Sequence, residues 1–501
     1  MEKKVVIIGA GIAGLAAGCY ARMNGYDVEI HETHNLPGGL CTSWKRGGYV
    51  IDGCIHWLTD SRPGTKFYRV WEELGVVQGR RMFDHDVFGS VVGLDGRSLH
   101  FYTDTDRFEE HLHELSPRDA RAIKDLCDLI RRLAGFSYSA GKAPELMGWW
   151  DRVRMMAGMV PYIKGFMNVS DLTLGALGAR FTDPLLRSGI SNLLHDETMS
   201  AMALVLTLGP MSRRAAGYPL GGSLEFARAI EQRFLNLGGR IVYRSRVEKV
   251  LERAGRAVGV RLANGGEVSA DYVISASDMR ATLFSLLDGS RVDPLHRELL
   301  ETGRLFSPIV QVTFGVNMDF SDQISCIGTS YELEQPIELA GRRLSYFSVK
   351  NYCYDASLAS PGKSVVGTGF TTDWSYWEPL IGDPSAYNAE KERIIAMCRE
   401  QIERRHPGFA SKIEMTDAAT PHTFARYTGN WKGTYMTWML SSDFRRKHSH
   451  IPKTVPGLSG FYLASMWTNP PGGISGAAGV GRGVVQLLCR EDRKRFLTAT
   501  P

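Results

Sequence analysis

The sequence predicts an α/β fold, and three observations near its N-terminus indicate this class. Residues 5–8 are the apolar run VVII, which is typical of a buried parallel strand. Residues 9–25 begin with closely spaced glycines, continue with Ala, Leu and Met, which favour a helix, and end at Gly25. Residues 26–32 read YDVEIHE and alternate as a second strand would. A β-α-β unit of about 30 residues predicts a Rossmann-like domain.

The later segments alternate between predicted helices and predicted strands. Residues 106–215 are expected to be mainly helical, because their apolar residues recur at helical spacing. Residues 218–239 predict a turn followed by a helix, and residues 240–276 predict short strands joined by turns. The remaining predicted elements are strands within 305–320 and 342–372, an amphipathic helix over 387–408, and a strand, turn and helix over 457–491.

The bulk properties limit the class of protein. With 501 residues the chain is long enough for two or three folding units. The formal net charge of +5 is too small to indicate a nucleic-acid partner, although it would help at an anionic membrane surface. The eight cysteines form no C-x-x-C pair, so we expect neither a metal site nor a disulfide scaffold. No long uncharged apolar stretch and no signal peptide are recognised, so we expect a cytoplasmic protein without a bilayer-spanning helix.

The first candidate site is the glycine motif after the first strand. Alone it would be weak evidence, but it follows a strand, opens a helix, and has Glu32 at the end of the next strand. Gly9 would allow the tight turn, Gly11 the approach of a pyrophosphate, and Gly14 the packing of helix on strand. Helix N-terminal amides would hold the phosphates, and Glu32 would accept hydrogen bonds from a ribose diol. The residues expected at the cofactor, NAD or FAD, are Gly9, Gly11, Ile12, Ala13, Gly14 and Glu32.

A second glycine pair, Gly38-Gly39, favours FAD over NAD. In a flavoprotein the chain must continue from the first β-α-β unit along the cofactor toward its ribityl chain and ring. Paired glycines would let the backbone lie close to the pyrophosphate. Thr42 and Ser43 follow as hydroxyl donors for the same region, after Leu40.

Four segments resemble the flavin-containing amine oxidase and phytoene desaturase superfamily. They are GAGIAGL with Glu32 followed by PGGLCTSWKRGGYVID, YPLGGSLEFARAIEQR, RVEKVLERAGRAVGVRLANGGEVSADYVISA, and GFYLASMWTNPPGGISGAAGVGR. The details are most similar to the phytoene desaturase branch, which includes carotenoid isomerases and retinol saturase. The resemblance implies FAD as cofactor and a glutathione-reductase-type FAD-binding domain. The sequence departs from the family at Leu40, where Arg is frequent, and at Ser465, where the family has Gly.

The resemblance also implies roles and boundaries farther along the chain. Val247 would meet the adenine through its backbone, and Gly472, Gly473 and Ile474 would face the pyrimidine edge of the flavin. Amides at that helix N-terminus would stabilise negative charge on the reduced ring. We expect a discontinuous FAD-binding domain of residues 1–105, 216–304 and 421–501. Residues 106–215 and 305–420 would form an inserted, mixed α+β domain that faces substrate and membrane.

The implied activity is an FAD-dependent oxidoreductase of a long apolar polyene or isoprenoid. It would desaturate, saturate or isomerise C=C bonds by hydride transfer at flavin N5. No second dinucleotide motif indicates bound NADPH, so we expect a quinone, oxygen or a redox protein as electron partner. Two alternatives stay open: a flavin amine oxidase that releases hydrogen peroxide, and a non-catalytic binding protein stabilised by FAD.

His56 is the candidate acid or base, because it follows the cofactor segment and titrates in a useful range. The alternative is a structural histidine packed beside Trp57. Trp57 and Trp431 are the candidates for substrate contact, and Asp52 is expected to bond backbone amides. The weaker candidates, each with a structural alternative, are His195, Glu197 and His422 as acids or bases, and Cys41 with Cys54 as a redox pair.

The segment 145–168 predicts a helix with an apolar face of its own. The residues that share this face are Trp149, Val153, Met156, Val160, Ile163 and Met167. Pro161 should kink or break the helix. Paired tryptophans with flanking Arg152, Arg154 and Lys164 are typical of a helix at a membrane interface, which would give peripheral contact on the inner face of the membrane. The alternative is a core-facing helix that covers the substrate cavity.

Overall fold

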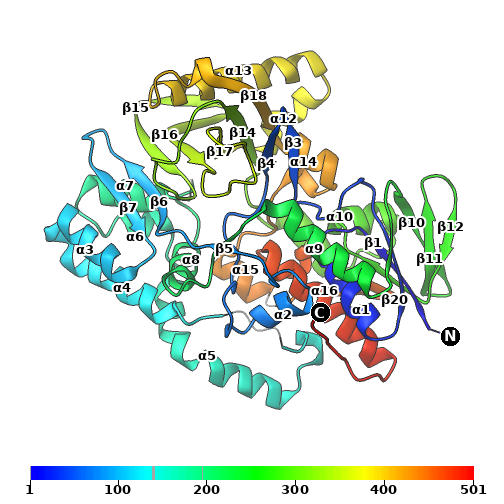
Figure 1. Cartoon of the computed structure of the whole chain (residues 1–501). Coiled ribbons are helices and arrows are strands. Elements are labelled where there is room, and N and C mark those ends of the chain that lie inside the picture. The colour runs from blue at the N-terminus through cyan, green and yellow to red at the C-terminus, as the bar shows by residue number, and fades with distance from the viewer. Residues whose placement is uncertain (1, 138–140, 195, 449) are drawn as a thin grey trace.

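The computed structural model describes residues 2–137, 141–194, 196–448 and 450–501, and it contains two large β-sheets (Figure 1). The first sheet has nine strands. Seven of them form its main path, in the order β10 (Val247–Arg253), β11 (Arg256–Leu262), β20 (Leu458–Leu463), β13 (Tyr272–Ser275), β1 (Lys4–Ile8), β2 (Asp27–His31) and β9 (Arg240–Val242). The other two are β12 (Glu267–Ser269), which pairs with β11, and β19 (Thr454–Val455), which pairs with β20.

β1 lies inside this sheet, and its neighbours β13 and β2 both run parallel to it. Val5 and Ile7 pack on one face, in the hydrophobic cluster of α1 (Ile12–Met23), α9 (Gly222–Asn236) and α16 (Gly473–Glu491). Val6 and Ile8 pack on the other face. A strand that is buried on both faces shows no polar alternation, which explains the run VVII. The predicted α/β class is confirmed.

The second sheet has seven strands and stands above the first in Figure 1. Its order is β18 (Ile413–Ala419), β14 (Ile309–Val316), β17 (Ser364–Thr371), β16 (Arg342–Asn351), β15 (Thr329–Leu339), β6 (Val87–Val92) and β7 (Ser98–Tyr102). Its outer face carries α12 (Trp374–Ile381) and α13 (Pro384–Glu403), which share a hydrophobic cluster with the strands. The expected boundary at residue 105 differs from this topology, because β6 and β7 join the second sheet through β15.

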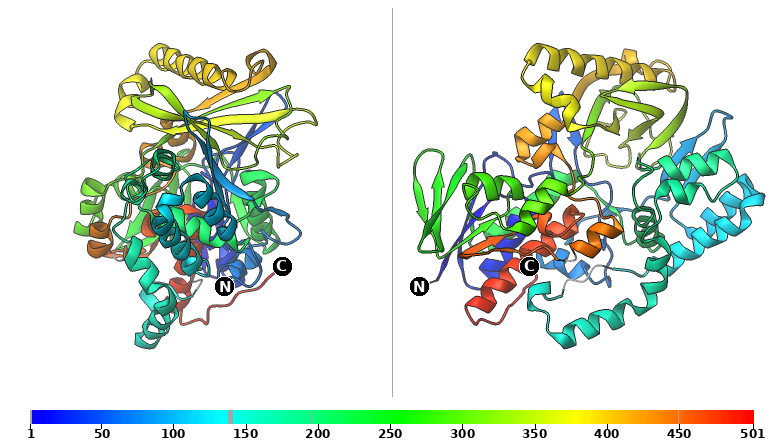
Figure 2. Two further views of the ribbon diagram at one scale, coloured as in Figure 1. Left: turned by 90° about the vertical axis from the view of Figure 1, so that its left-hand side faces the viewer. Right: turned by 180° about the vertical axis from the view of Figure 1, so that it is seen from behind.

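The mainly helical region follows β7 and packs against it, as Figure 2 shows from two sides. Its helices are α3 (Thr105–Leu115), α4 (Ala120–Leu133), α5 (Trp149–Val169), α6 (Leu174–Gly178), α7 (Pro184–Asn192) and α8 (Met202–Ser212). Among the described residues, no helix has the length and hydropathy that a bilayer crossing requires. The shorter elements elsewhere are α2 (Tyr68–Glu73), β5 (Met82–Phe83), β8 (Tyr218–Pro219), α10 (Met279–Ala281), α11 (Pro294–Thr302), α14 (Pro421–Thr428) and α15 (Ser442–Lys447).

A hairpin of β3 (Ser43–Arg46) and β4 (Tyr49–Asp52) connects the two sheets. The Trp44 indole donates to Asp417 on β18 over 3.0 Å, and the Tyr49 hydroxyl donates to Glu414 over 2.7 Å. At its other end the hairpin contacts α9, which packs on the first sheet. The contact is made by Asp52, whose carboxylate accepts from the amide of Ser223. The segment that follows β4 therefore lies between the two sheets.

Candidate functional site

The first glycine turn has the shape expected of a phosphate cradle. The amide of Gly9 donates to the His31 carbonyl over 2.8 Å, which joins the ends of β1 and β2. A Cβ on Gly14 would overlap the Gly9 carbonyl, so only glycine allows the helix to approach the strand. Gly11 caps α1 without a side-chain hydrogen bond, and the first turn, with Ile12 and Ala13, holds no acid. The N-terminal amides of α1 are thus available to an anion.

Glu32 stands beside this turn at the end of β2. One carboxylate oxygen accepts from the amide of Ala10 and the other from the amide of His34, each over 2.7 Å. The backbone of Glu32 accepts from the amide of Ser245 over 2.8 Å, which brings the buried start of β10 at Val247 to the same edge. Each carboxylate oxygen has a second lone-pair direction free for a ribose hydroxyl. Glu32 and the start of β10 at Val247 therefore lie at the same edge, where the adenosine half would bind.

The second glycine pair is in contact with the first turn. The Gly38 amide donates to the Ala10 carbonyl over 2.8 Å, and Gly38 pairs with Gly11 in an isolated parallel bridge. Gly38 has a φ of +107°, and a Cβ there would overlap the Cys41 carbonyl. A Cβ on Gly39 would lie 3.4 Å from the Cα of Gly11. Two side-chain-free backbones thus line one groove, which is the cradle that an extended pyrophosphate requires.

The residues after the pair divide between the groove and the protein interior. Leu40 and Thr42 keep partly exposed side chains next to Gly39. Ser43 instead is buried, donates to Asp52 over 3.1 Å, and accepts from the amide of Leu224 over 3.2 Å. Its expected hydroxyl contact with the cofactor is replaced by bonds that hold the hairpin on α9.

The C-terminal glycine turn opens a second helix without a cap. Gly472 and Gly473 have φ values of +97° and +81°, and α16 begins at Gly473 with no side-chain cap and no acid in its first turn. A Cβ on Gly473 would meet no atom within 4 Å, so open space lies beside the turn. Ile474 packs on the core cluster below it. The turn is therefore accessible, and its amides favour negative charge, as expected for the pyrimidine edge of a flavin.

The two uncapped helices cross each other closely. A Cβ on Gly481 of α16 would overlap the carbonyl of Ala13 near the start of α1. Gly481 lies eight residues after Gly473, which corresponds to about 12 Å along a helix. The phosphate turn and the C-terminal turn are therefore separated along one groove. This spacing fits an elongated dinucleotide with its pyrophosphate at α1 and its ring system at α16.

The segment from Asp52 to Thr59 leads from the hairpin to the second turn. The Thr59 and Ser475 hydroxyls are 2.7 Å apart, which ties the segment to the first turn of α16. Asp52 is buried and accepts from the Tyr218 hydroxyl over 2.7 Å. Burial raises the pKa of Asp52 above its ordinary value, and the hydrogen bonds from Ser223 and Tyr218 oppose that rise. The carboxylate is held on all sides by protein donors, which supports the structural role expected for it.

His56 lies within this segment, and its partner is a buried lysine that the sequence reasoning missed. The Nζ of Lys350, on β16, is 2.7 Å from the Nδ1 of His56. Burial lowers the pKa of Lys350 to about 8, although Asp52 opposes the shift. Burial, and secondly the charge of Lys350, lower the pKa of His56 well below its ordinary value. The His56 side chain is nevertheless exposed, so it is available to a ligand.

Aromatic side chains form the wall next to this pair. Tyr354 stacks on Phe83 with centroids 4.9 Å apart and contacts the rings of His85 at 4.8 Å and Tyr218 at 5.1 Å. Burial lowers the pKa of His85 to about 4, so this histidine is neutral. Trp57 packs edge-on against Phe88 at 5.4 Å and belongs to the cluster of the helical region. The wall is mainly aromatic and suits a largely apolar ligand.

Trp431 does not join Trp57. Its side chain packs with Trp438 and Trp467 in the cluster on the other face of the first sheet, and its amide donates to Asp278 over 3.0 Å. The structure therefore separates the two expected substrate residues.

The weaker candidates are dispersed. His195 lies outside the described residues, Glu197 is exposed in a loop, and His422 contacts the ring of Tyr387. Cys41 and Cys54 are free thiols, and burial raises the pKa of the Cys41 thiol well above its ordinary value. A protonated, buried thiol is unreactive, which argues against a redox pair.

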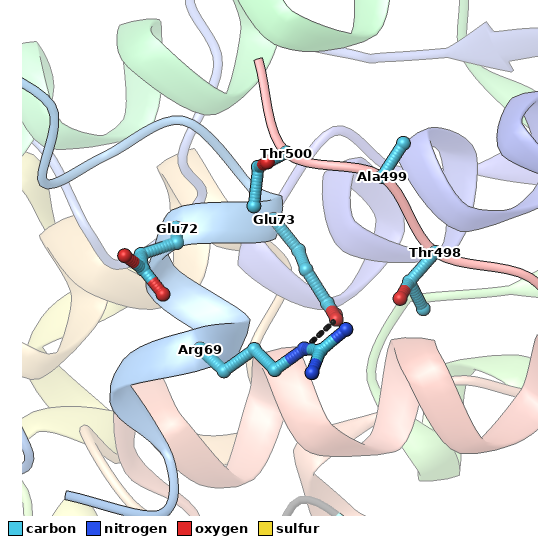
Figure 3. A pocket seen from close by; sticks show the side chains of 6 residues that line it. All are labelled: Arg69, Glu72, Glu73, Thr498, Ala499 and Thr500. Atoms are coloured by element: carbon cyan, nitrogen blue, oxygen red, sulfur yellow. Dashed lines mark hydrogen bonds and ion pairs between the residues drawn. The ribbon is translucent and has the colours of Figure 1, made fainter. Parts of the chain in front are cut away.

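A pocket of about 410 Å³ lies on the surface, where the C-terminal tail passes α2 (Figure 3). Its lining residues are Arg69, Glu72, Glu73, Thr498, Ala499 and Thr500. The Glu73 carboxylate already accepts from Arg69 over 3.2 Å and from the Tyr20 hydroxyl over 2.7 Å. The pocket contributes no residue to the glycine groove or to the aromatic wall.

α5 presents its predicted apolar face to the outside. The helix continues through Pro161, so the proline does not end it. All six predicted face residues are exposed, from Ile163 at 37% to Met167 at 73%. The opposite side packs on α4: Gly165 and Val169 are buried, and the Tyr162 hydroxyl donates to the Gly135 carbonyl over 2.7 Å. The structure excludes the alternative of a core-facing stripe.

Comparison with known proteins agrees with this geometry. The sequence model of a family described as "Flavin containing amine oxidoreductase" matches residues 12–489. A phytoene desaturase (neurosporene-forming) of Rhodobacter capsulatus is 24% identical, over 97% of this chain and 94% of its own. A chloroplastic prolycopene isomerase of Arabidopsis thaliana is 25% identical, over 86% of this chain and 73% of its own.

Solved structures share the fold. A Methanosarcina mazei oxidoreductase superposes with a TM-score of 0.60 at 16% identity, over 96% of this chain and 100% of its own. A cyclohexylamine oxidase from Brevibacterium oxydans gives a TM-score of 0.60 at 15% identity, over 99% and 100% of the two chains.

Proposed function

Because this chain belongs to the family of flavin-containing amine oxidoreductases, and is an FAD-dependent oxidoreductase, we propose that its substrate is a long apolar polyene or isoprenoid. The proposal includes desaturation, saturation or isomerisation of C=C bonds. The observation that carries it is the aromatic character of the wall next to the Lys350–His56 pair. Aromatic rings around Tyr354 supply apolar contact, and the one buried ammonium there, that of Lys350, would repel a cationic amine. The wall therefore favours a polyene over an amine.

The parts of the chain divide the work of such a reaction. When bound, FAD supplies hydride transfer at its N5 atom. Gly38-Gly39 and the N-terminus of α1 would hold its pyrophosphate, and Glu32 would hold its ribose. Gly472, Gly473 and the first amides of α16 would stabilise negative charge on the ring. Trp57 and the rings around Tyr354 would exclude water from the reacting carbons.

His56 would exchange the proton that accompanies the hydride. It is the accessible titratable side chain on the segment that joins the hairpin to α16, and Lys350 fixes its orientation. The electron partner in this proposal is a quinone, oxygen or a redox protein, since the sequence contains one β-α-β glycine motif.

An anaerobic titration tests the substrate class. The purified yellow holoprotein is mixed with phytoene or prolycopene, the polyenes named for the relatives, while the flavin absorption band is recorded. Bleaching of oxidised flavin shows oxidation of the polyene, and reoxidation of prereduced flavin shows its reduction. The product is then identified by chromatography, which also detects isomerisation without net change of the band. A panel of amines with a peroxide assay is run in parallel.

Three outcomes would contradict the proposal. Bleaching by amines, with peroxide on admission of oxygen, would assign an amine oxidase. A flavin that no polyene, amine or electron donor changes would assign a binding protein. A colourless protein without extractable FAD would contradict the cofactor itself.

We also propose that α5 rests on a membrane surface and admits a substrate dissolved in lipid. At about 100° per residue, Arg152 and Lys164 lie on the two sides of the apolar stripe, so cations border the exposed face. Such a helix inserts its apolar side among acyl chains and places its cations at anionic headgroups. α5 lies at the periphery of the molecule in both views of Figure 2, where a flat surface can reach it. The expected location is the inner face of a membrane.

Vesicle co-sedimentation tests the contact. Vesicles of phosphatidylcholine with about one third phosphatidylglycerol should pellet the wild type. The double variant Trp149→Ala/Trp150→Ala should pellet much less, because it removes two of the most exposed rings. Leu94→Ala is the matched control, since Leu94 is 58% exposed outside α5. Equal pelleting of the double variant and the wild type, or no pelleting of either, would refute the contact.

A further inference from the structure

The contact between Lys350 and His56 joins β16 to the segment after β4, which lies far away in the sequence. Lys350 is the penultimate residue of β16, and only 8% of it is exposed. Its Nζ lies 2.7 Å from Nδ1 of His56 and 4.2 Å from the ring centroid of Tyr352. Among the described residues, His56 is the only hydrogen-bond partner of Nζ. A change in the protonation of this amine therefore acts first on its hydrogen bond with His56.

The other charged or titratable groups around Lys350 do not compete for that bond. Asp52, on β4, attracts the ammonium, but its carboxylate is filled by donors from Ser43, Tyr218 and Ser223. Cys326, before β15, is a buried thiol with a raised pKa. His85, before β6, is neutral and interacts through Nδ1 with the Ser325 carbonyl at 3.2 Å. The hydrogen bond between Lys350 and His56 is therefore the contact around Lys350 that changes when the amine gains or loses its proton.

We propose that Lys350 is the positioning residue that decides which ring nitrogen of His56 carries the proton. An ammonium at Lys350 donates to Nδ1, so His56 must hold its own proton on Nε2 and offers a bound substrate a donor. A neutral amine can accept from Nδ1–H, which leaves Nε2 without a proton and offers a bound substrate an acceptor. The charge on Lys350 thus selects between proton delivery and proton removal by His56.

The inference rests on the proposed polyene chemistry, and the two directions balance. For saturation, the Nε2–H bond of His56 breaks and a C–H bond forms, while an N–H proton of Lys350 moves to Nδ1. Lys350 is left neutral, and the hydride that forms the second C–H bond comes from reduced flavin. For desaturation, a substrate C–H proton moves to Nε2, the Nδ1 proton moves to the neutral amine, and the hydride passes to oxidised flavin.

The lowered pKa of Lys350 places this choice near physiological pH. Burial lowers the pKa of Lys350 from 10.5 to about 8, so both charge states are populated within about one unit of pH 8. His56 itself stays uncharged there, because burial and the lysine charge lower its pKa. A neutral imidazole with a titrating neighbour changes tautomer rather than charge.

Nitrogen NMR of the holoprotein with 15N-labelled histidine reads the tautomer directly, and His56→Gln identifies the signals. In the wild type the proton should move from Nε2 to Nδ1 as pH rises through about 8. In Lys350→Arg the guanidinium stays charged, so the Nε2–H form should persist to about pH 10. In Lys350→Met the pH transition should be lost. Lys45→Met, which changes an exposed lysine on β3, should behave as the wild type.

Several results would overturn the inference. These are a wild-type His56 whose tautomer is constant between about pH 7 and 9, a charged His56 at pH 7, or a wild-type transition that survives in Lys350→Arg. The arginine variant retains the cation, so it keeps the test valid if Lys350→Met folds poorly. The readout needs no substrate. If phytoene and prolycopene neither change the flavin band nor give a product by chromatography, this result would count against the proposed function alone.

Discussion

Replacing Lys350 with methionine should make the protein more stable at neutral pH. The two side chains have similar length, so the substitution leaves no large cavity. What it removes is the ammonium of a residue that is only 8% exposed. The structure retains that charge at the expense of stability, which is the usual relation at a reactive site.

The size of the stability gain follows from the lowered pKa of Lys350. Its pKa is about 8 in the folded protein and 10.5 in an exposed chain. Each unit of pKa corresponds to about 1.4 kcal/mol, so the charged form costs about 3 kcal/mol below pH 8. Methionine leaves Nδ1 of His56 without its donor, which returns about 1 kcal/mol. The net expectation is a gain of about 2 kcal/mol at pH 7.

The stability difference between Lys350→Met and the wild type should change with pH in one direction. Between about pH 8 and 10.5 the unfolded chain binds the proton and the folded protein does not. The contribution of Lys350 to stability therefore rises with pH across this window. The advantage of Lys350→Met should shrink from pH 8 upward and vanish, or reverse slightly, near pH 10.5.

Calorimetric melting of the holoprotein at pH 7 and at pH 10 measures this difference. A chain of 501 residues that unfolds as one unit has an unfolding entropy of about 1 kcal/mol per degree, so the gain at pH 7 should be about 2 °C. Lys45→Met is the control and should change the midpoint by less than 1 °C, as is usual for exposed positions. A variant that melts below the wild type at pH 7, or an advantage that grows toward pH 10, would refute the reasoning.

Three further substitutions test the groove and the interior. Gly38→Ala places a Cβ on the Cys41 carbonyl at a positive φ, so the ratio of flavin to protein absorbance should fall at least tenfold, whereas Gly158→Ala, in open space on α5, should keep it. Gly481→Val should separate α16 from the Ala13 carbonyl and lower both melting temperature and flavin content; unchanged values would contradict the close crossing. Tyr218→Phe removes a donor from buried Asp52 and should cost about 2 kcal/mol in urea unfolding, with a further rise in the pKa of Asp52; a neutral effect would show that water replaces the hydroxyl.

The features that the sequence predicted correctly are those fixed by local rules. A glycine that must touch a neighbouring carbonyl, as Gly14 does, leaves a motif because no other residue fits. The period of α5 likewise follows from 3.6 residues per turn. The period could not say which side of α5 meets α4, because Tyr162 and Gly165 contact residues outside the segment.

The features that were missed depend on contacts between segments that are distant in the sequence. Lys350 and His56 are 294 positions apart, and no spacing connects them. The one available signal was a single lysine among the apolar residues of SYFSVKNY. The boundary at residue 105 failed for the same reason, because β6 pairs with β15 across more than 200 residues. Ser43 was expected to donate to the cofactor because it lies in the same segment as Gly38-Gly39. In the structure its hydroxyl donates to Asp52 instead.

The position of β20 has a consequence for biosynthesis. This strand fills the gap between β11 and β13, yet it leaves the ribosome about 180 residues after β13. At 5–20 residues per second the nascent chain waits roughly 10–40 s with two unsatisfied strand edges facing each other. β6 waits similarly for β15. Neither sheet can close before translation is nearly complete, so this chain should depend on chaperones that shield strand edges during synthesis, and a truncation before β20 should aggregate rather than yield a smaller folded enzyme.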